Sequence, residues 1–280
     1  MKSICTITSQ SHLPQTMVLR DSVLKYAPDL IFNILITDCE SIKLKGYEKT
    51  KFFTLYHLEK NDMAQSIIKK YKNEKDKLRW SLKAVFLTFL LTEHSFQKVI
   101  YVDNDICFFN DFNFLFSELE QKDVLLCPHW RCNEPEKNKT WFLVNFTDGL
   151  YNAGFIGITH KAIPVMIWWA KSCLFKCAKI YRKGLFDDQK YLDFIPVLYE
   201  NTGIIRHRGC NVAYWNRTEN KRIVKEDKIL INGVYEIVFI HFTKDLIKSI
   251  RSQKDKELTG FLNLYECALK KQKTLFSDGH

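Results

Sequence analysis

Apolar residues in this chain form short continuous runs that alternate with longer stretches of helical period. Runs with the length and composition of β-strands lie at 3–8, 31–36, 51–58, 99–102, 124–127, 151–158, 203–208 and 234–241. Residues 13–26, 61–93, 162–180, 191–198 and 244–273 instead follow helical patterns. The opening strand, helix and strand are typical of a right-handed crossover in a parallel sheet. We therefore predict an α/β fold, with a mostly parallel sheet flanked by helices.

Two carboxylates end the apolar run at 99–102, which is typical of a buried strand. Asp103 and Asp105 stand one residue apart. Ligands of open α/β sheets bind beyond the carboxyl ends of strands, where a pair of acids holds a hard divalent cation against a phosphate-bearing substrate. The tripeptide is short and common, so on its own it favours a strand that simply ends in a polar turn.

The second predicted strand ends beside Asp38, and the crossover would place Thr8 and Asp38 on the same edge of the sheet. An acid at this point is well placed to bond a ribose or a base. A turn-forming aspartate fits the position equally well.

Residues 61–93 are strongly basic, and most of their lysines fit a solvated helix face. Arg79 and Lys83 are four residues apart, on one helix face just before the strand that carries the paired acids. Two interpretations stay open: the pair reaches a diphosphate, or it is a simple surface pair.

Three later stretches add candidate site residues. Polar residues 129–147 have little periodicity and predict a long loop of the kind that often serves as a lid. Asn152 lies in a glycine-containing strand, where close approach of a ligand is one reason to tolerate glycine. Asp187, Asp188 and Gln189 precede a helical stretch and are also typical of a simple N-cap. A further predicted strand ends in His241.

Composition narrows the class of protein. The 280 residues are 46% hydrophobic with only 10 Gly and 6 Pro, which excludes a disordered chain. A formal charge of +10 favours anionic partners such as nucleotide phosphates, acidic lipid headgroups or nucleic acid. The nine cysteines include no Cys-x-x-Cys pair, so neither zinc nor a disulfide framework is indicated. Apolar runs are too short for a signal peptide or a membrane span, and we expect a cytoplasmic protein.

The last segment, 244–280, is predicted to be a basic helical extension after a catalytic domain spanning 1–243. Its apolar positions fit an amphipathic helix. Such a helix either docks on the core or makes a peripheral contact with the inner membrane surface.

The order of these elements resembles the GT-A fold of nucleotide-sugar glycosyltransferases, and most closely the retaining enzymes of glycosyltransferase family 8. The resemblance runs from Ile4 to about Thr243. Its most specific parts are Tyr101-Val102-Asp103-Asn104-Asp105, Tyr151-Asn152-Ala153-Gly154-Phe155, and Asp188-Gln189 before a helix.

The resemblance implies a role for each candidate. Asp103 and Asp105 would bind a divalent cation, Mn²⁺ or Mg²⁺, together with the donor diphosphate, and His241 would be the third ligand. Donor contacts are expected from Thr8, Asp38, Arg79, Lys83, Asp103, Asn104 and Lys244. Lys244 is a candidate only, because Thr243-Lys244-Asp245 departs from the family's glycine and Lys-Pro-Trp. Asp188 and Gln189 would flank the β face of the sugar, and Asn152 would contact donor or acceptor.

We accordingly expect a metal-dependent transfer of a hexose from a UDP-type donor to a saccharide or lipid-linked glycan, with retention. Whether Gln189 acts as nucleophile or as electrostatic partner stays open. One alternative is an inverting GT-A enzyme in which Asp187 or Asp188 is the general base. Another is a basic nucleic-acid-binding protein. Against it, most of the aromatic residues lie in apolar periodic runs rather than beside exposed basic residues.

Overall fold

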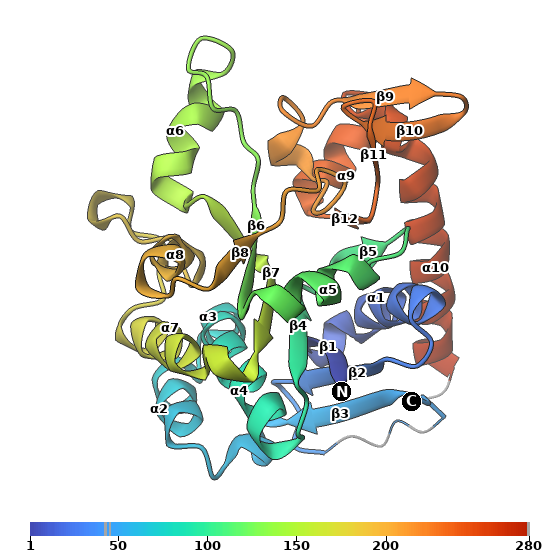
Figure 1. The fold of residues 1–280 in the computed structure, drawn as a ribbon. Coiled ribbons are helices and arrows are strands. Elements are labelled where there is room, and N and C mark those ends of the chain that lie inside the picture. The colour runs from blue at the N-terminus through green and yellow to red at the C-terminus, as the bar shows by residue number, and fades with distance from the viewer. Residues whose placement is uncertain (42–43, 45, 279–280) are drawn as a thin grey trace.

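A seven-stranded mixed sheet forms the centre of the molecule, shown in Figure 1 as a computed structural model that describes residues 1–41, 44 and 46–278. Its strands in chain order are β1 Lys2–Thr8, β2 Ile31–Ile36, β3 Thr50–Thr54, β4 Lys98–Val102, β6 Val124–Pro128, β7 Tyr151–Thr159 and β8 Thr202–Ile204. Their spatial order is β3-β2-β1-β4-β7-β6-β8. Among these strands only β7 is antiparallel to its neighbours. The carboxyl ends of β1, β2, β4 and β6 therefore share one edge with the start of β7.

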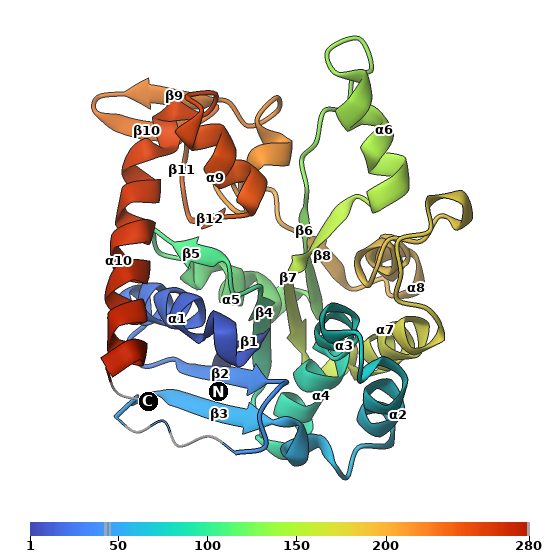
Figure 2. The ribbon, with the colours of Figure 1, turned by 180° about the vertical axis from the view of Figure 1, so that it is seen from behind.

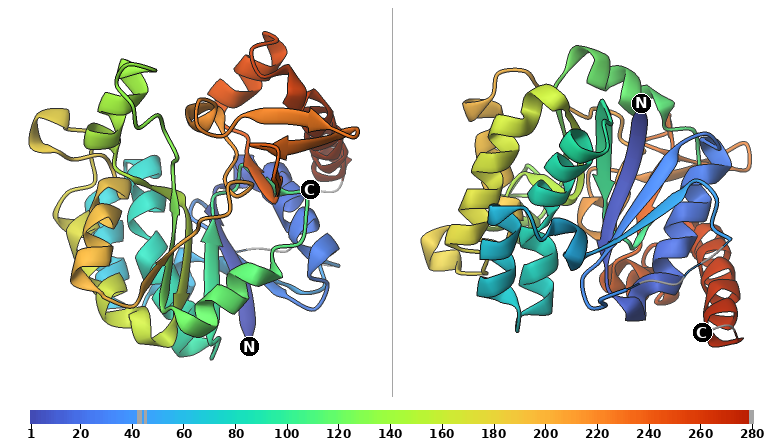
Figure 3. Two further views of the ribbon diagram at one scale, coloured as in Figure 1. Left: turned by 45° about the horizontal axis from the view of Figure 1, so that its top comes forward. Right: turned by 90° about the horizontal axis from the view of Figure 1, so that it is seen from below.

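Helices cover both faces of this sheet (Figure 3). The α-helices of the described chain are α1 Leu13–Tyr26, α2 Asp62–Tyr71, α3 Lys75–Ser81, α4 Lys83–Glu93, α5 Asn113–Gln121, α6 Lys139–Asp148, α7 Ile163–Phe175, α8 Ile195–Leu198, α9 Lys244–Arg251 and α10 Thr259–Asp278. Buried residues of α2, α3, α4 and α7 share one hydrophobic core with the sheet, and those of α1 and α5 share another. The predicted α/β class with a mostly parallel, helix-flanked sheet is confirmed.

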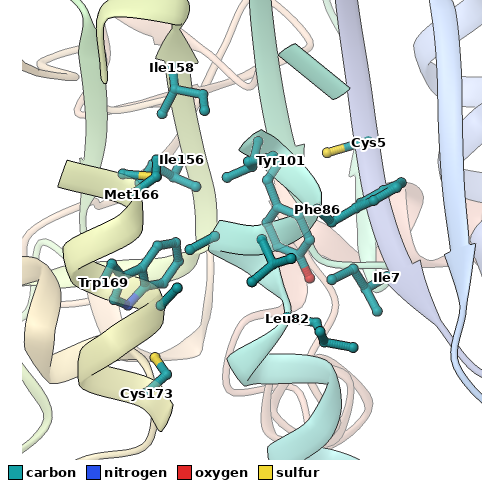
Figure 4. Close-up of a cluster of buried hydrophobic side chains, with 14 of the residues drawn as sticks. Cys5, Ile7, Leu82, Phe86, Tyr101, Ile156, Ile158, Met166, Trp169 and Cys173 are labelled. Carbon is teal, nitrogen blue, oxygen red and sulfur yellow. The ribbon is translucent and has the colours of Figure 1, made fainter. Parts of the chain in front are cut away.

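The first of these cores supports the edge of the sheet at which the acids lie. Figure 4 shows Tyr101 of β4 and Ile156 of β7 facing Phe86 of α4 and Trp169 of α7. Phe86, Ile156 and Trp169 are fully buried, and Tyr101 is 2% exposed. Burial of large apolar side chains such as these contributes about 1.5–3 kcal/mol each, so this core stabilises the end of β4 from which Asp103 follows.

Short strands outside the main sheet carry the histidine to the acids. β5 Ile106–Phe108 pairs antiparallel with β12 Phe239–His241, and His241 is in register with Ile106. The strands β9 Arg222–Lys225, β10 Lys228–Ile231 and β11 Tyr235–Glu236 form a separate antiparallel sheet. The pairing of β5 with β12 places His241 beside Asp105, the residue that precedes β5.

The C-terminal segment forms two helices, so the single amphipathic helix predicted for 244–273 is wrong. A turn around Asp255 separates α9 from α10, and the Asp255 carboxylate lies 3.1 Å from the buried guanidinium of Arg222. Leu246 and Ile250 of α9 pack into a third core, and α10 lies along α1 (Figure 2). The apolar face of α9 is thus used inside the protein. The domain boundary at 243 stays a prediction, and residues 279–280 lie outside the described residues.

Two other sequence predictions need correction. The expected long loop at 129–147 contains α6, which was missed because this helix buries none of its own residues and so lacks a core-facing stripe. The continuous helical stretch 61–93 is divided into α2, α3 and α4. None of the helices in the described chain is long and apolar enough to cross a bilayer.

Candidate active site

Asp103, Asp105 and His241 form a compact cluster at the carboxyl edge of the sheet. One ligand atom from each residue lies within 4.8 Å of the others. Asp103 follows β4, Asp105 precedes β5, and His241 ends β12. Carboxylate oxygens and an imidazole nitrogen are suitable ligands for Mg²⁺, Mn²⁺ or related divalent cations. The cluster therefore has the donor set that the sequence predicted for a cation site, contributed by three separate strand ends.

The imidazole of His241 is held in one orientation. Its Nδ1 donates to Oδ1 of Asn211 at 3.2 Å, and its Nε2 lies 2.9 Å from Oδ1 of Asp105. Trp215 packs edge-on against the ring at 5.3 Å. Burial disfavours the imidazolium, but the Asp105 carboxylate outweighs this effect and raises the pKa of His241. A second partner on Nδ1 is the usual way in which a metal-binding histidine is fixed, with Nε2 left to face the ion.

Gly154 leaves room for this cluster. A Cβ atom at this position would lie 2.5 Å from Oδ1 of Asn152, 2.7 Å from Cε1 of His241 and 2.9 Å from Oδ2 of Asp103. Distances below 3.0 Å are not tolerated for a real Cβ, so one of these three side chains would have to move. The glycine in this strand therefore accommodates close approach of the site's own side chains.

Lys83 joins the first acid to Asp188. Its ammonium lies 3.2 Å from Asp103 Oδ1 and 3.2 Å from Asp188 Oδ2, and it donates to the carbonyl of Ala153 at 3.0 Å. Tyr101 donates its hydroxyl to the same oxygen of Asp103 at 2.7 Å. Lys83 is 2% exposed. Its three donors are used inside the protein, so the alternative of a simple surface pair with Arg79 does not apply, while a diphosphate contact stays a prediction.

Asp188 is a buried carboxylate with a perturbed proton affinity. Burial raises the pKa of Asp188 to about 6, although the ammonium of Lys83 opposes the rise. Its backbone carbonyl accepts from the indole of Trp169 at 2.9 Å. Within the described chain the Asp188 side chain makes no capping hydrogen bond to the 3₁₀ helix Gln189–Phe194, so the simple N-cap interpretation does not apply. A buried carboxylate that titrates near neutrality is suited to chemistry.

An amide network lies next to this carboxylate. The Gln189 Oε1 accepts from Asn152 Nδ2 and from the backbone of Ala153, both at 3.3 Å, and its Nε2 donates to the Asp148 carbonyl at 2.8 Å. Asn152 Nδ2 also lies 3.2 Å from Nε2 of His129. Burial lowers the pKa of His129 well below its usual range, which keeps the imidazole neutral and able to accept this bond. Asn152 and Gln189 are thus fixed in position side by side.

A small cavity of about 170 Å³ opens onto the paired acids. It is lined by Ile7, His12, Arg79, Trp80, Tyr101, Asp103, Asn104 and Asp105. Arg79 reaches this lining while it also pairs with Asp76. Asn104 donates to Oγ1 of the buried Thr8 at 2.9 Å, which ties the Asp-x-Asp turn to the end of β1. Three of the residues predicted to contact the donor, Arg79, Asp103 and Asn104, therefore line this cavity.

Two predicted residues lie outside this arrangement. Asp38 is exposed and accepts from the backbone N–H of Gln10 at 2.8 Å, in line with the turn-forming alternative. Lys244 is exposed and lines a separate hollow with Lys248 and Arg251. Asp187 has a positive φ of 47°, and its carboxylate faces Lys179 at 3.5 Å, whereas the neighbouring Asp188 faces Lys83. Donor contacts by Asp38 and Lys244 stay predictions.

Several residues of the site carried no role in the sequence prediction. They are His129, Asn211 and Trp215, which contact Asn152 or His241, and Tyr101, which bonds Asp103. Tyr101 was visible as a polar-tipped residue two positions before the first acid. The other three reach the site only through tertiary pairing, and no local pattern marks them.

The chain was compared with known families and structures. The model of the family described as glycosyl transferase family 8 matches residues 3–245. YfnF of Bacillus subtilis strain 168, described as an uncharacterized protein, is 26% identical over 255 residues, which cover 89% of this chain and 84% of that protein.

Two solved structures share the fold. The galactosyltransferase LgtC, in complex with donor and acceptor sugar analogues, superposes with a TM-score of 0.54 at 15% identity, over 92% of this chain and 95% of that one. Mouse xyloside xylosyltransferase 1 gives a TM-score of 0.52 at 12% identity, over 88% and 99%. At these identities the likeness shows the fold, which is the GT-A fold of glycosyltransferases.

Proposed function

Because this chain belongs to glycosyl transferase family 8, we propose that it transfers a hexose from a nucleotide-diphosphate sugar, with UDP favoured, to a saccharide or glycolipid acceptor with retention. The family and the fold make the chain a glycosyltransferase; the donor, the stereochemistry and the metal are the proposed part. The cluster of Asp103, Asp105 and His241 is the observation that carries the proposal. A carboxylate pair with one histidine suits a site that must bind an ion and a diphosphate together.

The cluster would hold Mn²⁺ or Mg²⁺. Departure of a nucleoside diphosphate builds negative charge on its phosphate oxygens, and a bound cation stabilises that charge as it develops. The protein's own part is to fix the ligands: Tyr101 and Lys83 hold Asp103, and Asn211 holds His241. Arg79 and Asn104 would face the diphosphate from the cavity lining.

The buried network beyond Lys83 would face the sugar. An ionised Asp188 and the Gln189 amide stabilise positive charge at the anomeric carbon, and Asn152 positions a sugar hydroxyl. Gln189 Oε1 already accepts two bonds, from Asn152 and from the Ala153 backbone. This arrangement supports an electrostatic role for Gln189 over a nucleophilic one. A solved variant of LgtC is described as an active-site glutamine-to-glutamate mutant, so an active-site glutamine has a precedent in this fold.

An inverting reaction is the second candidate, and one observation favours it. The raised pKa of Asp188, about 6, suits a general base that takes a proton from an acceptor hydroxyl. Asp187 is the weaker choice for this role because its carboxylate is turned toward Lys179.

Two measurements test the proposal. Calorimetry with a panel of UDP-, GDP- and CMP-sugars in the presence of Mn²⁺ should give binding for a UDP-hexose; the panel includes UDP-xylose, because xyloside xylosyltransferase 1 shares the fold. Binding of no nucleotide sugar would refute the proposal. NMR of the first product formed should show the donor's anomeric configuration; the opposite configuration would select the inverting alternative with Asp188 as base.

A further inference from the structure

A second, larger cavity of about 690 Å³ lies next to the candidate active site. Three of its lining residues are adjacent in sequence to residues of the candidate site. They are Trp130 next to His129, Tyr151 next to Asn152, and Lys190 next to Gln189. Its lining residues come from the end of β6, the start of β7, the end of β8 and the helix α6, elements that Figure 3 (left) shows near one another. Its volume is in the range of sites for small ligands.

Part of the cavity lining is apolar and aromatic. The side chains that form it are Trp130, Phe142, Phe146, Leu150 and Tyr151. Phe146 on α6 is 63% exposed and Leu150 is 51% exposed, although both are large apolar groups. Flat apolar surfaces beside polar groups suit the face of a sugar ring, since such a ring presents C–H groups on its faces and hydroxyls at its rim.

The rest of the cavity lining carries an excess of positive charge. Four basic residues, Arg131, Lys190, Arg206 and Arg208, face two acids, Asp193 and Glu219. Lys190 is paired with Asp193 at 2.9 Å. Exposed Arg206 has no hydrogen bond or ion pair to any residue that the structure describes. One guanidinium at the rim is thus left available for an anion.

Two further arginines extend this positive surface. Arg208 is stacked 3.4 Å from the centre of the Trp130 ring and donates to Asn220 at 3.2 Å. Arg131 is 7% exposed, donates to the Gly149 carbonyl at 2.7 Å, and leaves its Nε without a partner among the described residues. Burial lowers the pKa of Arg131 to about 10, so it remains charged at neutral pH. The Asp148 carboxylate, at 3.8 Å, only partly compensates this buried charge.

We infer that this cavity binds the acceptor, and that the acceptor is an anionic saccharide with a carboxylate or phosphate group placed at Arg206. The inference rests on the proposed glycosyl transfer, because the cavity adjoins the residues proposed to face the donor sugar. The ring would lie against the aromatic residues of the lining, and the anionic group would take the charge-assisted hydrogen bonds that Arg206 lacks. A neutral glycan would leave that guanidinium with water as its only partner.

The test uses matched pairs of probes with the full chain. Cellobiouronic acid is compared with cellobiose, and glucose 6-phosphate with glucose, by saturation-transfer NMR titration without donor. We expect the anionic member of one pair to bind at least about tenfold more tightly than its neutral partner, an effect of about 1.4 kcal/mol. The pair that shows the preference identifies the anionic group as carboxylate or phosphate.

The variant Arg206→Gln should remove most of that preference, whereas the control Arg182→Gln should retain it. Arg182 is also an exposed arginine, but it lies outside the cavity. Equal affinity for anionic and neutral probes, or an unchanged preference in Arg206→Gln, would overturn the inference. Titration with the panel of nucleotide sugars in the presence of Mn²⁺ separates the two claims. Binding of a nucleotide sugar without a preference for anionic acceptors rejects only the acceptor inference, whereas binding of no nucleotide sugar rejects the proposed function.

Discussion

Replacement of Gly154 by alanine is the sharpest structural test of the candidate cation site. The added Cβ would lie 2.5 Å from Asn152 Oδ1, 2.7 Å from His241 Cε1 and 2.9 Å from Asp103 Oδ2. Ordinary contact begins at 3.4 Å. To reach that distance, Asn152 Oδ1, His241 Cε1 and Asp103 Oδ2 would have to move by about 0.9, 0.7 and 0.5 Å, respectively. A metal site holds its ligand distances within about 0.2 Å.

His241 has little freedom to retreat. Its ring is fixed by Asn211 and Asp105 and contacted by Trp215. A displaced ligand or a disturbed supporting bond typically lowers metal affinity about 10- to 100-fold. That range corresponds to about 1.4–2.7 kcal/mol of binding free energy. We expect Gly154→Ala to weaken Mn²⁺ binding by this amount, as measured by calorimetry.

Gly157→Ala is the matched control on the same strand. Its Cβ would meet Leu119 Cδ1 at 3.1 Å, Leu125 Cβ at 3.3 Å and Ile100 Cγ1 at 3.4 Å, so the neighbours need to move by only about 0.3 Å. Both variants lose the same backbone freedom in the unfolded chain. Circular dichroism should show that both are folded, and Gly157→Ala should bind Mn²⁺ within about threefold of the parent. Equal Mn²⁺ affinity of Gly154→Ala and the parent would show that the side chains around Gly154 do not hold the ion.

Three further predictions concern charge. Because an acid is ionised above its pKa, the transferase rate should fall as the pH drops through about 6, which gives the pH–rate profile an acidic limb. Asp188→Asn should lower kcat about 100-fold and abolish this acidic limb. An acidic limb that persists in Asp188→Asn would assign the titration to another group. Lys83→Met removes the cation that opposes the rise in the pKa of Asp188, so the acidic limb of the pH–rate profile should move to higher pH. A shift of this limb to lower pH would show that the Lys83–Asp188 ion pair does not lower the pKa of Asp188. Asp255→Asn leaves the 2% exposed side chain of Arg222 without its ion-pair partner and should cost about 3–5 kcal/mol in urea unfolding, whereas a loss below about 1 kcal/mol would show that α9 and α10 do not depend on this pair.

Local sequence patterns predicted the elements better than their arrangement. The strand beginning at Ile31 and the helix beginning at Leu13 followed directly from apolar spacing. The antiparallel placement of β7 between β4 and β6 depends on pairing between residues far apart in the chain, so no local pattern specifies it. The helix α6 was not predicted because it buries none of its residues and therefore has no apolar stripe in its sequence.

The candidate site shows the same division. The place of Asp103 and Asp105 at a strand end was expected from the sequence pattern, and His241 as a third ligand was implied by the family resemblance. Lys83 was expected on a helix face shared with Arg79, yet it lies in an otherwise apolar first turn of α4 and is drawn inward by two carboxylates. Spacing along a helix predicts which residues share a face, but it does not predict which residues of other elements that face contacts.

Cation-dependent turnover is the most direct test of the central claim, that Asp103, Asp105 and His241 bind an ion for nucleotide-sugar chemistry. UDP release from the best-bound UDP-sugar is measured for the parent chain and for Asp105→Ala, first with Mn²⁺ and then after complete chelation. We expect chelation to abolish UDP release by the parent chain and added Mn²⁺ to restore it, while Asp105→Ala stays inactive with or without Mn²⁺. Full donor hydrolysis by Asp105→Ala, or activity of the parent chain that survives chelation, would show that this cluster does not bind a required ion.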